Sequence, residues 1–186
     1  NGLVAVGGSN DSDDTIEAAR WTGGGTSISG LGHLSGGGDL SEARGASSTG
    51  SVIVGASDAT AGLRAFRWTT SGISVLPDIP GMLVDAAAND VSDDGTVIVG
   101  NANNSPSTTV QPHAVRWVGP GFASAQLLGT LPGASFPTSN ARAVSANGAI
   151  VVGTANDENS DDAAFLWDAA NGMRKLRDVL QTEYGL

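Results

Sequence analysis

The sequence predicts an all-β protein, a β-propeller-like array of about four antiparallel four-stranded blades. Three observations predict it. The tryptophans, Trp21, Trp68, Trp117 and Trp167, recur at intervals of 47, 49 and 50 residues. The segments between them repeat the same short phrases in the same order, and turn residues separate the phrases. Propeller repeats occupy about 40 to 50 residues. Another stack of β-repeats is the alternative, because a sandwich needs no repeated phrases.

The first phrase is rich in β-branched residues and predicts a buried strand. Its copies lie at residues 2–7, 50–55, 95–100 and 148–153. Apolar side chains on both faces are typical of strands that are covered on both sides, and β-branched residues suit a pleated sheet. Each blade is therefore expected to shield its neighbour.

The second phrase ends in the tryptophan and predicts a strand with two different faces. Its copies are residues 18–21, 65–68, 114–117 and 164–167. In Ala-Phe-Arg-Trp the side chains alternate, so the aromatic pair shares one face and the Ala–Arg pair shares the other. One aromatic per blade can then fill the wedge between neighbouring sheets.

Two further phrases complete the predicted four strands of each unit. The third has a Leu-x-x-Leu pattern, with copies at residues 31–36, 76–81, 128–133 and 176–180. The fourth begins with Ala, ends in Ser, and lies at residues 43–47, 88–92 and 141–145. Thr-Gly, Asp-Gly and Asn-Gly junctions connect it to the next Val-rich phrase, and Asp-Gly and Asn-Gly are strong hairpin signals.

These phrases divide the chain into one repeat domain, residues 1–186. Its units are approximately 1–50, 51–95, 96–148 and 149–186. The pattern is cut within a unit at both ends, so a segment of a larger propeller is expected. Open blade edges would promote self-association.

Composition excludes several classes of function. With 19 acidic and 9 basic residues the formal charge is −10, and Lys175 is the single lysine. A nucleic-acid partner is disfavoured, because it needs a basic surface. There is no cysteine for a disulfide or a Cys-ligated metal. No apolar run reaches the roughly 18 residues of a membrane span. No signal peptide is visible, although the composition suits an exported bacterial protein.

The phrases resemble the HAF-type bacterial extracellular repeat, on residues 65–68, 76–81 and 88–100. The segment 172–180 with 184–186 looks like the Gly-Met-Arg-x-Leu-x-Asp-Val-Leu part of such repeats in autotransporter-like surface proteins. Leu166 and Ala19 depart from the pattern. The resemblance implies an extracellular or bacterial cell-surface location. It implies no catalytic residue.

Two acidic segments are candidates for a calcium site. Residues 10–14 and 156–162 lie at equivalent places in the first and last units. Clustered carboxylate and amide oxygens suit Ca²⁺. Neither segment has the Asp-x-Asp-x-Asp-Gly ligand order, so solvated hairpin loops are favoured. No cofactor and no metal ligand is predicted.

The arginine before the tryptophan recurs in register, as Arg20, Arg67 and Arg116. One interpretation is a ring that binds an anion or a glycan. The favoured one is structural, with the stem covering the sheet and the guanidinium pairing with a carboxylate of the next blade. Asp78 and Asp90 are the proposed carboxylates.

The sequence favours the absence of catalytic activity. His33 and His113 occupy different repeat positions, with no nucleophile motif beside them. The pair Asp93–Asp94 precedes Gly95 and is explained by a turn. Glycine runs at 23–25 and 36–38 lack the lysine of a phosphate-binding loop.

The leading hypothesis is therefore a secreted or surface-displayed interaction module. It would bind a glycan or a protein through the loops between strands, the longest at residues 101–112. One alternative is a carbohydrate-active enzyme with Asp78, Asp90 and Asp178 converging at the propeller centre. Another is a self-associating filament or matrix subunit.

Overall fold

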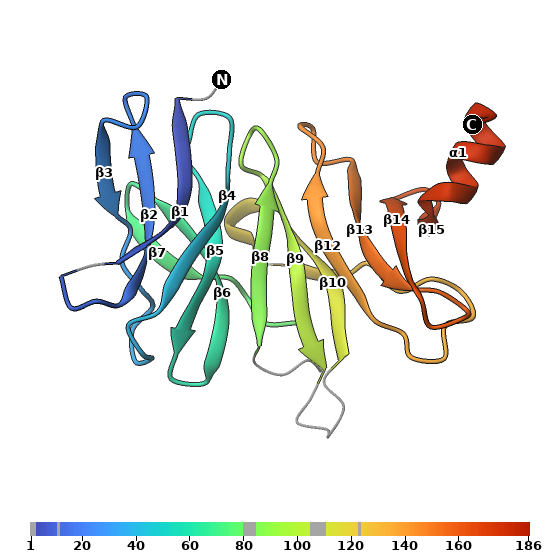
Figure 1. Cartoon of the computed structure of the whole chain (residues 1–186), viewed down its shortest axis with the longest axis horizontal. Helices are drawn as coiled ribbons and strands as arrows, with labels where there is room; N and C mark the ends of the chain where they lie inside the picture. The colour runs from blue at the N-terminus through green and yellow to red at the C-terminus, as the bar shows by residue number, and fades with distance from the viewer. Residues whose placement is uncertain (1–2, 11, 80–84, 105–110, 123) are drawn as a thin grey trace.

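A computed structural model shows an all-β chain with one C-terminal helix (Figure 1). It describes residues 3–10, 12–79, 85–104, 111–122 and 124–186. The strands form four antiparallel sheets, the first with three strands and the others with four. This confirms the predicted fold class. The helix is not long and apolar enough to span a membrane, and it is the only α-helix among the described residues.

Each sheet consists of strands that follow one another along the chain. Sheet 1 contains β1 (Val4–Asn10), β2 (Ile16–Thr22) and β3 (Ser27–Gly30). Sheet 2 contains β4 (Ser41–Ala46), β5 (Ile53–Ala59), β6 (Gly62–Thr69) and β7 (Gly72–Val75). Sheet 3 contains β8 (Ala86–Val91), β9 (Val97–Asn104), β10 (Gln111–Val118) and β11 (Ser124–Leu127), with the 3₁₀ turn η1 (Pro120–Phe122) between the last two. Sheet 4 contains β12 (Ser139–Val144), β13 (Ile150–Asn156), β14 (Asp162–Asp168) and β15 (Gly172–Lys175), and α1 (Leu176–Tyr184) follows.

The fourth phrase supplies the first strand of the following sheet. Strands β4, β8 and β12 each pair with the Val-rich strand that comes next in the chain. The sheets therefore begin before the Val-rich phrase, whereas the repeat units were counted from about that phrase. The first sheet lacks such a strand among the described residues, and it has three strands for that reason.

The assignment of the Leu-x-x-Leu phrase to a strand is wrong. The last strand of each sheet is the short segment before it, as β7 precedes Leu76 and Ile79. Leu76 N–H still donates to the Ala65 carbonyl, at 2.9 Å, and the chain then leaves the sheet. Both apolar side chains are buried between sheets 2 and 3. The two residues are three positions apart, which does not fit the period of two of a strand. The segment is therefore a connection whose apolar side chains fill the space between the sheets.

The last copy of this phrase lies in a helix, which was not predicted. Residues 176–180 begin α1, and Val179 is buried at the position of the phrase that Ile79 occupies in the second copy. This copy lacks the Pro or Gly of the other copies, and its residues tolerate a helix well. Gly185, with a φ of 68°, ends the helix, as is usual for a left-handed C-cap.

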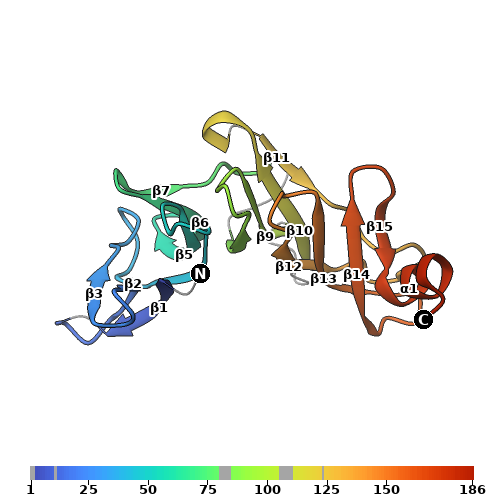
Figure 2. The ribbon, with the colours of Figure 1, turned by 90° about the horizontal axis from the view of Figure 1, so that it is seen from above.

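The sheets stack through the first strand of each following sheet. Strand β8 packs on β4, β5 and β6, and β12 packs on β8, β9 and β10. Three apolar clusters lie between successive sheets. Seen from above, the sheets follow one another as an open array from the N-terminal to the C-terminal end (Figure 2). Each sheet thus covers a face of its neighbour, as the repeat requires.

Candidate functional site

The recurring arginines stack on aromatic rings of the next sheet. Arg20 lies 4.6 Å from the ring centroid of Trp68, and Arg116 lies 5.4 Å from that of Trp167. Arg67 lies 5.2 Å from Phe122. Cation–π contacts of this kind are stabilising when they are desolvated. The stacking of each guanidinium on a ring between the sheets supports the structural interpretation.

The predicted carboxylate partners of these arginines are wrong. Among the described residues, none of the three arginines forms an ion pair, and the Nε atom of each is buried without a hydrogen-bond partner. Asp78 pairs with Arg64 instead. Asp90 accepts a hydrogen bond from the Val144 N–H, at 2.9 Å. The aromatic ring, rather than a carboxylate, lies within reach because the wedge between the sheets is filled by apolar side chains.

The three candidate catalytic carboxylates lie on different elements and have different partners. Asp78 follows β7, Asp90 lies on β8, and Asp178 lies on α1 beyond sheet 4. Each contacts a different group, and Asp178 pairs with Arg177, which precedes it in the helix. A glycoside-cleaving pair needs two carboxylates about 5 to 10 Å apart across one bond. No hydrogen bond or ion pair among the described residues joins two of the three carboxylates, and the carbohydrate-active enzyme stays a prediction.

The histidines lie in different parts of the array. His33 follows β3 and lies 3.5 Å from a carboxylate oxygen of Asp39. His113 lies on β10, half-buried, and burial lowers its pKa from the ordinary value of 6.5. Asp94 accepts hydrogen bonds from Ser92 and Thr96 within its turn, and these bonds lower its pKa. That is the turn role that the sequence predicted.

The acidic loop at residues 156–162 neutralises the single lysine. Lys175 Nζ lies 3.2 Å from Asp157 and 2.5 Å from Glu158. Hydrogen bonding to Glu158 is the main cause that raises the pKa of Lys175. Within the described ranges no three His, Asp or Glu side chains converge to hold a metal ion. Asp11 of the first acidic loop lies outside the described residues.

Half of the longest predicted binding loop, residues 101–112, lies outside the described part of the chain, and the described half belongs to strands rather than to a loop. Residues 105–110 are not described, and the flanking residues belong to β9 and β10. The structure therefore leaves this loop as a prediction.

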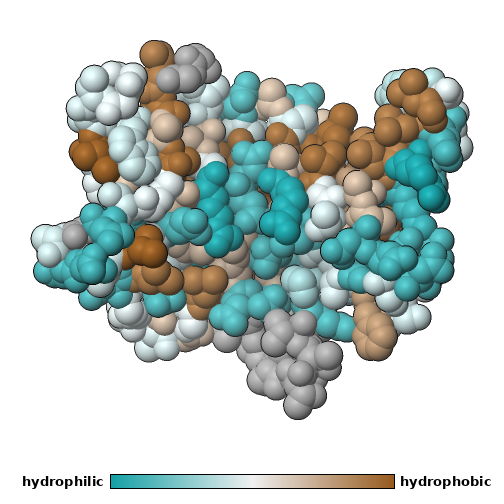
Figure 3. Space-filling model, in the orientation of Figure 1, coloured by the Kyte–Doolittle hydropathy of each residue, from teal (hydrophilic) through white to brown (hydrophobic). Residues whose placement is uncertain are grey.

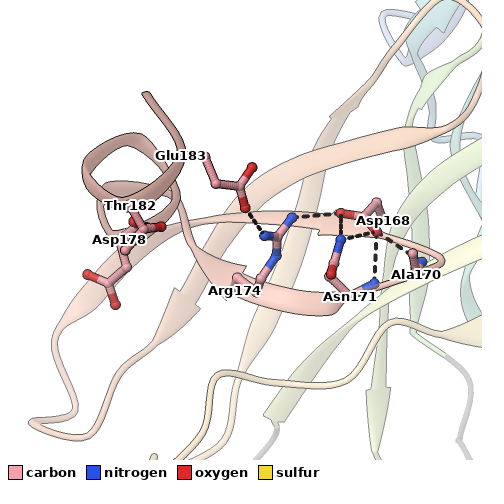
Figure 4. Close-up of polar contacts among 7 residues, drawn as sticks. All are labelled: Asp168, Ala170, Asn171, Arg174, Asp178, Thr182 and Glu183. Carbon is pink, nitrogen blue, oxygen red and sulfur yellow. Dashed lines mark hydrogen bonds and ion pairs between the residues drawn. The ribbon is translucent and has the colours of Figure 1, made fainter. Parts of the chain in front are cut away.

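A pocket of about 360 Å³ lies between sheet 4 and α1. Its lining combines apolar and charged side chains: Pro132, Met173, Val179, Thr182, Glu158, Arg174, Lys175 and Asp178. Figure 4 shows Arg174 between two carboxylates, 2.7 Å from Asp168 and 2.5 Å from Glu183. The bond to Glu183 is the main cause that raises the pKa of Arg174. Arg174 and Lys175 are each paired with carboxylates. The ion pairs of Arg174 connect α1 to sheet 4, and neither cation is left unpaired for a ligand.

A second polar surface follows the first strands of sheets 2, 3 and 4. Arg44, Asn89 and Arg142 occupy the same position of the fourth phrase. In each strand the pairing register skips this residue, between Ala43 and Gly45 in β4 for example. A β-bulge leaves its extra residue out of the ladder and re-aims its side chain. We call these three residues the bulge row.

The bulge row connects neighbouring sheets. An Arg44 nitrogen donates to the Asn89 side-chain oxygen at 3.1 Å, and the Asn89 amide donates to Asn140 at 2.9 Å and to the Ala141 carbonyl at 2.8 Å. Arg142 is exposed, and no hydrogen bond or ion pair connects it to a described residue. Hydrophilic side chains gather over β4, β8 and β12 on this face (Figure 3). The guanidinium of Arg142 thus presents hydrogen-bond donors that can bind carboxylates or carbonyl groups.

The bulge row was not predicted from the sequence. The recurring first variable position of the Ala-x-x-Val-Ser phrase was a signal for it, because that position is Arg, Asn and Arg in the three copies. The pattern alone did not reveal the bulge, since the phrase was interpreted as a regular strand.

Comparisons with known proteins identify structures of similar fold. No family model and no curated protein matches the chain. It is similar to the structure of a putative TolB from Agrobacterium tumefaciens, with 17% identity and a TM-score of 0.60 over 94% of this chain and 61% of that chain. It is also similar to TolB from Acinetobacter baumannii, with 14% identity and a TM-score of 0.63 over 94% of this chain and 40% of that one. The chain thus spans less than two thirds of either protein. The likeness shows the fold, which is that of a partial β-propeller.

Proposed function

We propose that this chain is a non-catalytic interaction module of the β-propeller type, secreted or displayed on the bacterial surface, that binds a protein partner through the bulge row. The observation that carries the proposal is Arg142. Its counterparts Arg44 and Asn89 donate hydrogen bonds to the next sheet. The Arg142 guanidinium donates none to a described residue.

The position of the row supports a binding role. Propeller blades surround a central channel, and β4, β8 and β12 are the strands that contact one another across the sheets. The row therefore follows the inner edge of the array. A guanidinium recognises carboxylates and carbonyls through a planar fork of donors. The expected partner is a protein segment that presents such acceptors.

The recurring side chains of the Trp phrase support the absence of catalysis. Arg20, Arg67 and Arg116 stack between sheets, and Trp117 donates its Nε1–H to the Pro77 carbonyl at 2.9 Å. The extracellular location remains a proposal that rests on the composition and on the resemblance to HAF-type repeats.

The proposal is tested by comparative capture. Immobilised wild-type chain and the Arg142→Glu variant are incubated with secreted and cell-surface fractions of the bacterium that encodes the chain. Quantitative mass spectrometry should find a protein retained at least about tenfold less by Arg142→Glu, because a reversed charge repels the acceptors. The matched control is Arg177→Glu, an exposed arginine on α1, which should retain it.

Equal capture by all three chains would contradict the proposed site. A glycan array run with the same variants separates the other partner class. Glycan binding that survives Arg142→Glu, without a protein whose capture depends on Arg142, would replace the protein partner with a carbohydrate.

A further inference from the structure

Each hairpin turn between the first two strands of a sheet rests on the sheet before it. A Cβ atom on Gly95 would lie 2.7 Å from Val52, and one on Gly148 would lie 2.5 Å from Val97. Gly50 has the same relation to Val4, at 2.7 Å. Both the contact and the positive φ of about 70° require glycine. The turn glycine and the valine beneath it form a seat that occurs three times.

The fourth seat is uncovered. Val52 and Val97 are 7% and 6% exposed, whereas Ile150, at the same position in sheet 4, is 42% exposed. The neighbouring Val152 and Leu166 are only partly buried, and their counterparts in sheet 3 include Val99, which is fully buried. The side chains of this face are as apolar as those of the covered ones, so the difference comes from the missing neighbour.

The C-terminal helix covers only part of this face. Helix α1 packs on β14 and β15, where Leu176 and Leu180 line a small apolar pocket beside Ala164. No described element packs on the Ile150 end of β13 as β12 packs on β9. We call this uncovered part, Ile150 with Val152 and Leu166, the end face.

We propose that the end face docks a further four-stranded sheet of the same repeat, with the glycine of its first hairpin turn seated on Ile150. At each of the three internal interfaces the occupant is the next sheet, with its turn glycine on the valine beneath it. The end face presents the same positions of the repeat. Leu166 replaces the stacking arginine, so the docked sheet would place an apolar side chain on it, with no cation–π contact. A docked sheet would also bring its first strand to Arg142, as sheet 4 brings β12 to Asn89, so this proposal and the proposed function of the bulge row compete for Arg142.

A second copy of this chain fits the end face less well. Contacts between successive sheets are made through the first strand of the following sheet. Sheet 1 has no such strand among the described residues, since β1 begins the chain of pairing. The described part of sheet 1 therefore has no turn between a first strand and a Val-rich strand to place on Ile150.

The absence of cysteine makes a direct test practical. The Ile150→Cys variant carries one thiol on the end face, and the Ile28→Cys variant carries one on sheet 1, where Ile28 is 52% exposed. Each is made in the native chain and in a chain extended after residue 186 by a copy of its own residues 139–186. The rate of thiol labelling by a maleimide is measured in all four proteins.

We expect the extension to slow labelling of Ile150→Cys at least about tenfold and to leave Ile28→Cys unchanged. A linked sheet is present at a high effective concentration, so it occupies its site. The Gly148→Val substitution within the appended copy should restore fast labelling, because valine cannot enter the seat.

Two results would overturn the inference. One is an unchanged labelling rate at position 150, including the case in which the appended sheet stays disordered, since the end face would then not support the sheet that folds on Val97. The other is a rate that falls as the unextended chain is concentrated, which would identify a second copy as the occupant.

Discussion

The outward faces of sheets 3 and 4 have nearly the same side chains but differ in how far those side chains are buried. Val97 and Val99 on sheet 3 are buried by the next sheet, whereas Ile150 and Val152 on sheet 4 are partly exposed. Hydrophobicity does not distinguish them. Burial in a repeat array therefore depends on the neighbouring sheet. The contribution of a residue to the free energy of unfolding depends on its place in the array.

The faces differ in one chemical respect. Arg116 on sheet 3 stacks on Trp167 and donates to the Gly148 carbonyl at 3.2 Å, and burial lowers its pKa. Leu166 holds the same position on sheet 4. An arginine is useful where a ring lies above it, and a leucine suits a face without one.

The largest expected effect comes from the seat of the turn glycine. Gly148→Ala should lower the free energy of unfolding by about 3 kcal/mol, because it combines an unfavourable positive φ with a collision against Val97. Gly172→Ala is the matched control, since its φ of 70° is similar and nothing lies within 4 Å of its added Cβ. It should cost only about 1 to 2 kcal/mol. Chemical denaturation measures both.

A double variant sharpens this result. Val97→Ala removes the two methyl groups, one of them 2.5 Å from the new Cβ, and keeps its own Cβ at 2.9 Å. The collision is relieved in part, so Gly148→Ala with Val97→Ala should cost less than the sum of the single changes. Strict additivity would show that the turn does not rest on Val97.

The second effect tests burial by position. Val97→Ala should cost about 2 kcal/mol, because it leaves a cavity between sheets 3 and 4. Ile150→Ala removes more atoms from the equivalent place, yet it should cost less than about 1 kcal/mol because the site is open. Equal losses in urea-induced unfolding would contradict the distinction between a covered and an open face.

The smallest effect concerns the stacked arginine. Arg116→Leu should cost about 1 kcal/mol, since it removes the contact with Trp167 and leaves the Gly148 carbonyl without that donor. The reverse change on the end face, Leu166→Arg, should alter stability by no more than about 0.5 kcal/mol. Thermal unfolding of the two variants compares them, and a neutral Arg116→Leu would mean that the stack contributes nothing measurable.

Local signals explain which parts of the fold were predictable. The Val-rich strands, the Trp strands and the Asp-Gly and Asn-Gly turns depend on preferences of a few adjacent residues, and all of them appear in the structure. The Leu-x-x-Leu segments were misassigned because their burial comes from the interface between sheets. Helix α1 was missed because its sequence was interpreted by analogy with three copies that contain Pro or Gly.

The partners of individual side chains were less predictable. Arg67 stacks on Phe122, which the turn η1 places there, and the other two arginines stack on tryptophans. The bulge row depends on a one-residue shift in pairing, which a repeated phrase does not reveal.

By itself the sequence determined the repeat, the all-β class and the position of the turns, because these depend on chain-local propensity and on period. Only the tertiary structure decided which faces are sealed, which ring each arginine meets and which polar side chains remain free at the inner edge. Those outcomes depend on the distance and angle between neighbouring sheets, which bring together residues as far apart in the chain as Arg44 and Asn89, and the spacing of residues along the chain does not encode them.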